Sequence, residues 1–350
     1  MTTNQNSSGQ RPTSTKTRLA GLTNRFPLGG QTALLLGVFV VLIIFFGVLG
    51  NRFLTGRSIS SMGFQLPELG VLALAMMFPI ITGGINLSVN ASQNLAAVLA
   101  GLFLLRMVPA TASPGQQWLF IGVAFLLALV VGLVCGVLNG FLIGRVGVPP
   151  ILATLATMTF FTGISTVLTG GKTVTGFPDP VSVIGSKSLL GIPIPFIVFV
   201  LITILSYYLL YRTSFGFKVR MMGANPTAAN FSGINNANIL MQIYIISGIF
   251  SAVTGILVMG RTMSAAIEYG STTYVLLTIL ITVLAGIIPG FGSMLDMFIS
   301  VLILQILSTG FHNLLSGVRG SSFFRDFAWG VLLILIFIIN YYTRRRRAQE

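Results

Sequence analysis

Long apolar runs separated by short polar stretches dominate the chain from residue 32 onward. The first run, Thr32–Gly50, has about the 20 residues that a helix needs to cross a bilayer. Nine further runs follow, at residues 68–82, 91–107, 117–143, 149–170, 193–212, 238–260, 272–288, 295–310 and 327–343. The pattern predicts an all-α polytopic membrane protein with about ten transmembrane helices. Because the runs at 68–82 and 91–107 are short, eight or nine spans is the alternative if one of them is re-entrant.

Two polar segments flank this region. Residues 1–30 are rich in Ser, Thr, Asn and Gln and carry basic but no acidic residues, which predicts a disordered basic tail. No small-residue cleavage site follows the first apolar run, so we interpret it as a retained helix rather than a removable signal peptide. Residues 31–343 are then the transmembrane domain, and residues 344–350 form a second basic tail.

The composition agrees with a membrane location. The 350 residues are 54% hydrophobic and only 7% charged, whereas soluble domains have about 25% charged residues. A soluble enzyme, a fibrous protein and a disulfide-stapled secreted domain are therefore excluded. A net charge of +14 would indicate a nucleic-acid partner in a soluble protein. Here the basic residues cluster in both tails and in one loop, so we predict no nucleic-acid partner.

The positions of these basic residues predict the orientation of the chain. Cytoplasmic loops near helix ends are enriched in Lys and Arg. With ten spans, both tails and the loop carrying Arg212, Lys218 and Arg220 fall on the same side. We therefore expect a multi-pass protein of the bacterial cytoplasmic (inner) membrane with both termini in the cytoplasm. Residues 344–347, all arginine, are interpreted as orienting the last helix, with binding of acidic lipid headgroups as the alternative.

Candidate catalytic residues are scarce. Cys135 lies in an apolar run and is the only cysteine, and His312 is the only histidine, which excludes cysteine-based metal sites and the usual nucleophilic triads. Residues 170–173 resemble the end of a phosphate-binding loop, but Thr166 stands where that loop requires glycine. We therefore predict no catalytic residue, no metal site and no cofactor in this chain.

The acidic residues bear on the type of transport. Apart from the terminal Glu350, they are placed at predicted helix ends or in loops: Glu68, Asp179, Glu268, Asp296 and Asp326. Ion-coupled carriers usually bury carboxylates or histidines near the membrane midplane. The pattern therefore argues against an ion-coupled secondary carrier and indicates an uncharged solute.

A regular glycine pattern occupies the fourth apolar run. One glycine recurs at every helical turn: Gly132, Gly136, Gly140 and Gly144. Small residues at this spacing let two helix backbones approach closely within lipid. We interpret the pattern as a helix-packing interface, with a role in helix movement during gating as the alternative.

Polar residues interrupt two apolar regions. Residues 83–90 introduce glycines and small polar side chains, as broken helices do where transporters contact their substrates. The alternative is a plain loop in which Asn90 or Ser92 caps the next helix. Hydroxyl groups also follow the fifth run, and they either bind a polyol or hydrogen-bond their own helix. The hydroxyl residues are Thr154, Thr157, Thr159, Thr162 and Ser165. The pathway candidates from both regions are Asn86, Ser88, Asn90, Asn94, Thr154 and Thr157.

The basic loop after the sixth run contains a short helix signal. Asn225 is a good N-cap, Pro226 suits the first helical position, and Gly233 suits the end. The predicted helix exposes Ala228, Ala229, Phe231 and Ile234. Such a helix is suited to docking into a groove on a partner protein. The alternative is an interfacial helix that lies on anionic lipid.

Three of these segments carry a family resemblance. Residues 83–89, Gly-Gly-Ile-Asn-Leu-Ser-Val, resemble the Gly-Gly-Ile-Asp-Leu-Ser-Val-Gly signature of ribose-type ABC importer permeases, a family that also serves other monosaccharides and autoinducer-2. Residues 148–158 resemble that family's Pro-Phe-Ile-Ala-Thr-Leu-Gly-Thr-Met stretch. Residues 213–235 resemble its Gly-x-Asn-Pro-x-Ala-Ala-x-x-Ser-Gly-Ile loop. The likeness runs from about residue 68 to residue 340, in the same order.

The resemblance implies the permease subunit of an ATP-driven importer of a neutral, sugar-like solute. Such permeases pair as homodimers or heterodimers, receive solute from an extracytoplasmic binding protein and use a separate ATPase subunit that binds ATP and Mg. The segment at about 225–234 would be the coupling helix that contacts the ATPase. Its coupling residues would be Asn225, Pro226, Ala228, Ala229 and Gly233, although Thr227 stands where many members have Glu.

Some positions depart from the family pattern. Asn86 replaces the usual Asp and Asn90 the usual Gly, and residues 287–294 also differ from the family's glycine-rich region. A divergent branch with another solute is one explanation, and autoinducer-2 rather than a nutrient sugar is an alternative cargo. Two rival functions stay open at this point: an ion-coupled secondary carrier for a neutral solute, and a non-transport scaffold or assembly factor.

Overall fold

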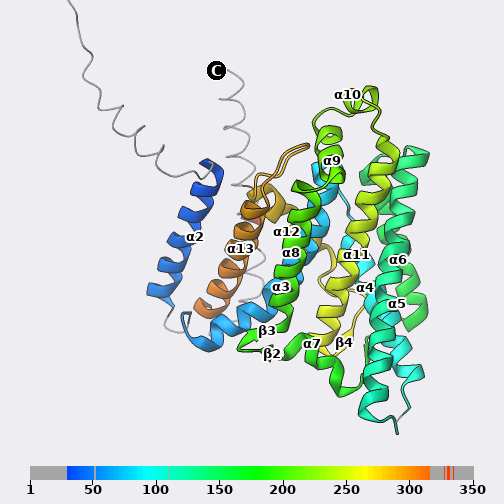
Figure 1. Ribbon diagram of the computed structural model, residues 1–350. Helices are drawn as coiled ribbons and strands as arrows, with labels where there is room; N and C mark the ends of the chain where they lie inside the picture. The colour runs from blue at the N-terminus through cyan, green and yellow to red at the C-terminus, as the bar shows by residue number, and fades with distance from the viewer. Residues whose placement is uncertain are drawn as a thin grey trace, which may run out of the picture.

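The computed structural model describes residues 30–50, 53–109 and 111–315, together with residues 327, 329–331 and 334. These residues form a bundle of long helices that lie roughly side by side (Figure 1). The predictions for residues 1–29, for the arginines at 344–347 and for most of the last predicted span fall outside the described residues.

Two helices in the first half of the bundle begin at recognisable side-chain caps. Thr55 caps the second helix, and Ser113 forms a capping box with Gln116 at the start of the fourth. The helices are α2 (Gly30–Leu49), α3 (Gly56–Ile81), α4 (Val89–Met107), α5 (Pro114–Phe141) and α6 (Pro150–Thr169). A π-helical turn, η1 (Leu142–Val146), extends α5 before the chain reverses into α6.

The second half adds long helices and short connecting elements. The helices are η2 (Asp179–Val181), α7 (Ser182–Ser186), α8 (Ile194–Tyr211), α9 (Ser214–Ala224), α10 (Pro226–Phe231), α11 (Asn236–Thr262), α12 (Ser271–Leu284) and α13 (Met294–Leu314). The strands are β1 (Val174–Thr175), which pairs antiparallel with β4 (Ser264–Ala265), and β2 (Ser188–Leu189), which pairs with β3 (Ile192–Pro193). Helix α10 lies at one end of the bundle, and α7, β2, β3 and β4 lie at the other (Figure 1).

The all-α prediction is confirmed, but the count of about ten spans is not. Among the described residues, seven helices are long and apolar enough to cross a membrane: α2, α3, α5 with η1, α6, α8, α11 and α13. Helix α4 falls short because its first turns carry Asn90, Ser92, Gln93 and Asn94. Helix α12 has 14 residues and rises about 21 Å, against a hydrocarbon core of about 30 Å.

The most buried helices are α3 and α11, which contact one another and most of their neighbours. The outer helices leave large apolar side chains uncovered, such as Val48 on α2, Leu126 on α5 and Leu201 on α8. This inverted distribution is what a chain that faces lipid requires, because lipid tails solvate apolar side chains. Polar side chains are instead gathered inside, around α4, α6 and α11.

Candidate functional site

The polar interruption between α3 and α4 folds into the bundle as a continuous hydrogen-bonded chain. Asn86 Nδ2 donates to Ser247 Oγ of α11 (2.9 Å), and Asn86 Oδ1 accepts from Ser88 Oγ (2.8 Å). Ser88 Oγ accepts from Asn139 Nδ2 of α5 (2.8 Å), and Asn139 Oδ1 accepts from Thr157 Oγ1 of α6 (2.6 Å). All five side chains are buried. This polar chain, Asn86–Ser88–Asn139–Thr157–Ser247, ties the segment to three helices.

Thr154 joins the same segment to α6. Its Oγ1 accepts from the backbone N–H of Leu87 (3.1 Å) and donates to the carbonyl of Pro150 in its own helix (2.7 Å). The sequence left two interpretations of this hydroxyl open, a pathway role and a bond to its own helix. The structure places it in a closed network, where its oxygen already has partners from both the interrupted segment and α6.

Asn90 and Asn94, one turn apart on α4, contact a different part of the chain. Asn90 Nδ2 donates to the carbonyls of Tyr269 (3.0 Å) and Ser271 (3.1 Å). Asn94 Nδ2 donates to the carbonyls of Ile267 (2.8 Å) and Tyr269 (3.1 Å). Helix α4 begins at Val89 without a side-chain cap, so the alternative in which Asn90 or Ser92 caps it is wrong. Both amides are used to hold the connection between α11 and α12.

A cavity of about 580 Å³ opens beside these two asparagines. It lies between α4, α6 and the start of α12, and we call it the α4–α6 cavity. Its polar lining residues are Asn90, Asn94, Thr159, Thr162, Thr166, Glu268, Ser271 and Thr272. The Thr159 and Thr162 hydroxyls donate to carbonyls of their own helix, at 3.2 and 2.8 Å, and their oxygens remain acceptors toward the cavity.

The six pathway candidates therefore separate into two groups. Asn86, Ser88, Thr154 and Thr157 belong to the closed network, whereas Asn90 and Asn94 line the cavity. The sequence did not point to Ser271 and Thr272, and it placed Glu268 only as a helix-end acid. Their signal is weak because they lie in the connection before α12 and at the start of α12, far from α4 and α6 in the sequence. Only the folded chain brings these parts together.

Helix α10 forms where the residue types predict it. Asn225 Oδ1 accepts from the backbone N–H of Ala228 (3.0 Å), Pro226 is the first helical residue, and Gly233 adopts φ +80° after the helix ends. The side chain of Asn236 also donates to the carbonyl of Pro226 (2.9 Å), which fixes the helix to the start of α11. Both contacts hold the N-terminal end of the short helix.

The predicted exposed face of α10 is partly wrong. Phe231 is 89% exposed and Ala228 is exposed, but Ala229 is fully buried and Ile234 is nearly so. A six-residue helix rests one side on the bundle, and the Ile234 N–H bonds back to the Ala229 carbonyl (3.0 Å), which turns both side chains inward. The face that a partner can reach consists of Thr227, Ala228, Asn230 and Phe231.

Comparison with known proteins identifies the family. Residues 58–340 match the family described as "Branched-chain amino acid transport system / permease component". The chain belongs to this permease family. It is 34% identical over 310 residues to the ribose import permease protein RbsC of Bacillus subtilis (strain 168), covering 87% of this chain and 91% of the relative. It is 29% identical over 317 residues to the autoinducer 2 import system permease protein LsrD of Yersinia pestis (strain Pestoides F), covering 88% and 90%.

No solved structure matches this chain significantly. The two relatives confirm the resemblance that the motifs at 83–89, 148–158 and 213–235 indicated. Both relatives are named import permeases, and both align over nearly the full length of the chain.

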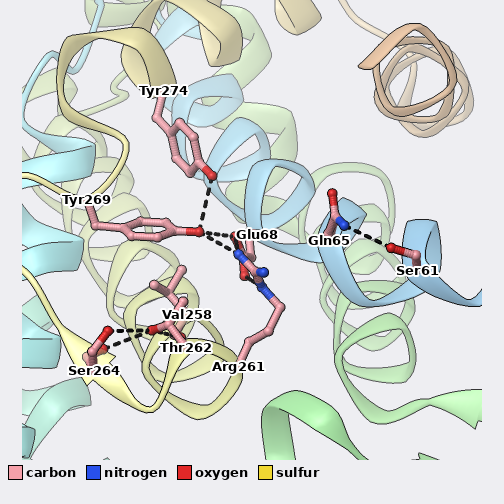
Figure 2. Close-up of polar contacts among 9 residues, drawn as sticks. All are labelled: Ser61, Gln65, Glu68, Val258, Arg261, Thr262, Ser264, Tyr269 and Tyr274. Carbon is pink, nitrogen blue, oxygen red and sulfur yellow. Dashed lines mark hydrogen bonds and ion pairs between the residues drawn. The ribbon is translucent and has the colours of Figure 1, made fainter. Parts of the chain in front are cut away.

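The permease also contains an ion pair between Glu68 and Arg261, and the apolar pattern predicted the wrong position for Glu68. Glu68 was expected at a helix end, but α3 begins at Gly56 and carries Glu68 well inside the helix, where it is 2% exposed. The first turns of α3 are polar, so the apolar run concealed where the helix starts. Both Glu68 oxygens accept from the Arg261 guanidinium, and Tyr269 Oη donates to Oε2 at 3.0 Å (Figure 2).

The glycine pattern of α5 lies against α11. A Cβ atom added to Gly132 would meet the Gly248 carbonyl, and one added to Gly136 would meet the Tyr244 carbonyl. Gly140 and Gly144 lie in the same way against Met241 and Ala237. The two backbones are therefore in direct contact over several turns, and we call this contact the glycine interface.

Proposed function

We propose that the permease is the membrane-spanning subunit of an ATP-driven importer that moves a neutral, sugar-like solute into the cytoplasm. The relatives named for ribose import and autoinducer 2 import support this class of cargo. The amides and hydroxyls of the α4–α6 cavity, which lie among apolar side chains such as Met158 and Ile267, support an uncharged solute that bears hydroxyl groups. ATP and Mg are bound by a separate ATPase subunit, so the permease itself carries no catalytic residue or cofactor.

Helix α10 is the observation that carries the proposal. It is capped by Asn225, anchored through buried Ala229, and presents Phe231 at one end of the bundle. A fixed short helix with one exposed aromatic side chain suits a groove on a soluble partner, since buried aromatics are frequent anchors of interfaces. We therefore assign the cytoplasmic end of the bundle to α10 and the ATPase contact to its outer face.

The opposite end of the bundle, at α7, β2 and β3, would face the extracytoplasmic binding protein. Closure of the ATPase pair would push α10 and, through the directly following α11, move the connection to α12 that borders the cavity. The permease would then have two conformations, and the ATPase would contact α10 differently in each. Binding that favours one conformation over the other is the basis of alternating access. A second permease copy or a paralogue would complete the membrane portion, with lipid around the remaining faces.

The ion pair bears on the main rival, an ion-coupled secondary carrier. A coupling carboxylate must gain and lose its ion during each cycle. Glu68 instead has both oxygens occupied by Arg261, a partner that stays charged. Glu68 is therefore unsuited to the ion-coupling role that a secondary carrier requires.

The docking assignment is tested by Phe231→Asp in the permease co-expressed with its ATPase subunit. We expect loss of ATPase co-purification with normal insertion of the permease, because the exposed ring has no packing role. Leu190→Asp is the matched control, since Leu190 is 96% exposed but precedes β3 at the opposite end. Retained co-purification in Phe231→Asp contradicts the assignment.

The energy source is tested in liposomes that contain the permease, its ATPase and its binding protein. Uptake is expected to require ATP and to ignore a proton gradient. Uptake driven by the gradient without ATP would instead support the secondary carrier.

A further inference from the structure

The connection between α11 and α12, residues 263–270, lies between the α4–α6 cavity and the buried ion pair. On the cavity side, the Asn90 and Asn94 amides hold the carbonyls of Ile267, Tyr269 and Ser271. On the other side, the Tyr269 hydroxyl reaches Glu68 and Arg261. We call residues 263–270 the gate loop, because its position is set by contacts on both of its sides.

Figure 2 shows how Tyr269 reaches the ion pair. Its hydroxyl donates to Glu68 Oε2 (3.0 Å) and accepts from Arg261 Nη2. The Tyr274 ring stands edge-on to the Tyr269 ring, with centroids 5.6 Å apart. Three groups, from α3, α11 and α12, thus converge on the hydroxyl of this gate-loop residue. Removing this hydroxyl would detach the gate loop from α3 without changing the shape of the ring.

The cavity side of the gate loop is held by groups that a solute can also use. An asparagine amide offers a donor and an acceptor. The donors of Asn90 and Asn94 are given to gate-loop carbonyls, and Asn90 Oδ1 is buried without a hydrogen-bond partner among the described residues. A buried polar atom without a partner is unfavourable. This oxygen is therefore a ready acceptor for a hydroxyl group.

We propose that the α4–α6 cavity is a binding site for a neutral polyhydroxylated solute and that the gate loop covers the part of it that contains the Asn90 and Asn94 amides. When the gate loop moves away, solute hydroxyl oxygens replace its carbonyls on the Asn90 and Asn94 amides, and a solute hydroxyl donates to Asn90 Oδ1. The exchange keeps the amides hydrogen-bonded in both states. The ion pair and Tyr269 hold the closed state from behind.

The lining of the cavity selects the chemical class of this solute. Amides and threonine hydroxyls both donate and accept, which suits a molecule whose hydroxyls do the same. The exposed Glu268 carboxylate is the one ionised side chain among the described lining residues, and it accepts hydrogen bonds but repels anions. Anionic solutes such as sugar phosphates are therefore disfavoured. This inference rests on the proposed function in taking the cargo to be sugar-like.

The gate is tested by cysteine accessibility in the full chain in lipid nanodiscs. The native buried cysteine is removed with Cys135→Ala, and Thr162→Cys places a thiol on the cavity wall. Adding Tyr269→Phe is expected to raise the rate of labelling by a fluorescent maleimide at least tenfold. Thr169→Cys, on the same helix outside the cavity, is the control and should not respond. Equal rates at Thr162→Cys with and without Tyr269→Phe overturn the gate.

The solute class is tested with the same Thr162→Cys thiol in the Tyr269→Phe background. D-ribose, D-xylose and D-galactose at 100 mM are the probes, and at least one is expected to slow labelling severalfold. Ribose 5-phosphate, a charged probe that the Glu268 carboxylate repels, should not. If no sugar protects the thiol from labelling, the proposed site is overturned, whether or not a charged probe protects it. The ATPase takes no part in this assay, so a failure of ATPase docking at Phe231 would be seen separately from a failure here.

Discussion

Two polar regions of the bundle adjoin around residues 86–94, and they differ in how fully their polar side chains are hydrogen-bonded. In the polar chain around Asn86 and Asn139, each polar side-chain group has a partner at 2.6–3.1 Å. In the α4–α6 cavity, Asn90 Oδ1 has none among the described residues, and the Thr159 and Thr162 hydroxyls donate only to carbonyls of their own helix. The first region is complete without a ligand, whereas the second has unused hydrogen-bonding capacity.

The difference shows how to separate structural from functional polar residues inside a membrane protein. A buried polar group is stabilising only if it is hydrogen-bonded. A closed network therefore holds helices in place, and an open one is a candidate for binding. The residue type alone does not distinguish them, since asparagine and threonine occur in both regions.

The largest expected effect comes from the ion pair behind the gate loop. Arg261→Met leaves the Glu68 carboxylate buried without its counter-charge, which is expected to lower the free energy of unfolding by about 3–5 kcal/mol. Titration with SDS in mixed micelles measures this loss. The double variant Glu68→Leu with Arg261→Met should recover more than half of it. A double variant as unstable as the single one would contradict this role of the charge.

The next effect tests whether the polar chain is structural. Asn139→Leu leaves Ser88 and Thr157 without their partner, at about 1–3 kcal/mol for each orphaned group, so we expect a loss of about 2–4 kcal/mol. Asn94→Leu is the control from the open region, where water in the cavity can hydrate the released carbonyls. Its loss, measured in the same micelles, should be clearly smaller. Equal losses would remove the distinction between the two regions.

The smallest changes in stability are expected from substitutions of two threonines on α6. Thr157→Val breaks a bond to another helix and should lower stability by about 1 kcal/mol with little effect on uptake. Thr162→Val loses only a bond within its own helix and should keep stability within about 0.5 kcal/mol, while sugar uptake into liposomes falls severalfold. The reverse pattern, with Thr157→Val impairing uptake at normal stability, would assign the pathway to the polar chain instead.

Local signals in the sequence predicted local structure well. The cap at Asn225 and the proline at 226 fixed the start of α10, and one glycine per turn indicated a close helix contact on α5. These features depend on residues a few positions apart, so their geometry follows from helix periodicity. The family motifs at 83–89 and 213–235 then gave the correct family.

The remaining features depend on contacts between distant segments. Glu68 was misplaced because polar first turns hid the start of α3, and its partner Arg261 lies on another helix. The burial of Ala229 depends on how α10 rests on the bundle. The cavity needs α6, α4 and the gate loop together. Hydropathy along the chain carries no information on these three arrangements.

The glycine interface between α5 and α11 constrains how this sequence can change over time. Gly132 and Gly248 each face the other's carbonyl, and a Cβ on either would collide with backbone atoms. An enlarged side chain in a protein core is often accommodated when its neighbour becomes smaller, but here the neighbour is already the smallest amino acid. No second substitution at the facing position can therefore rescue the first, and this contact cannot drift by paired replacements.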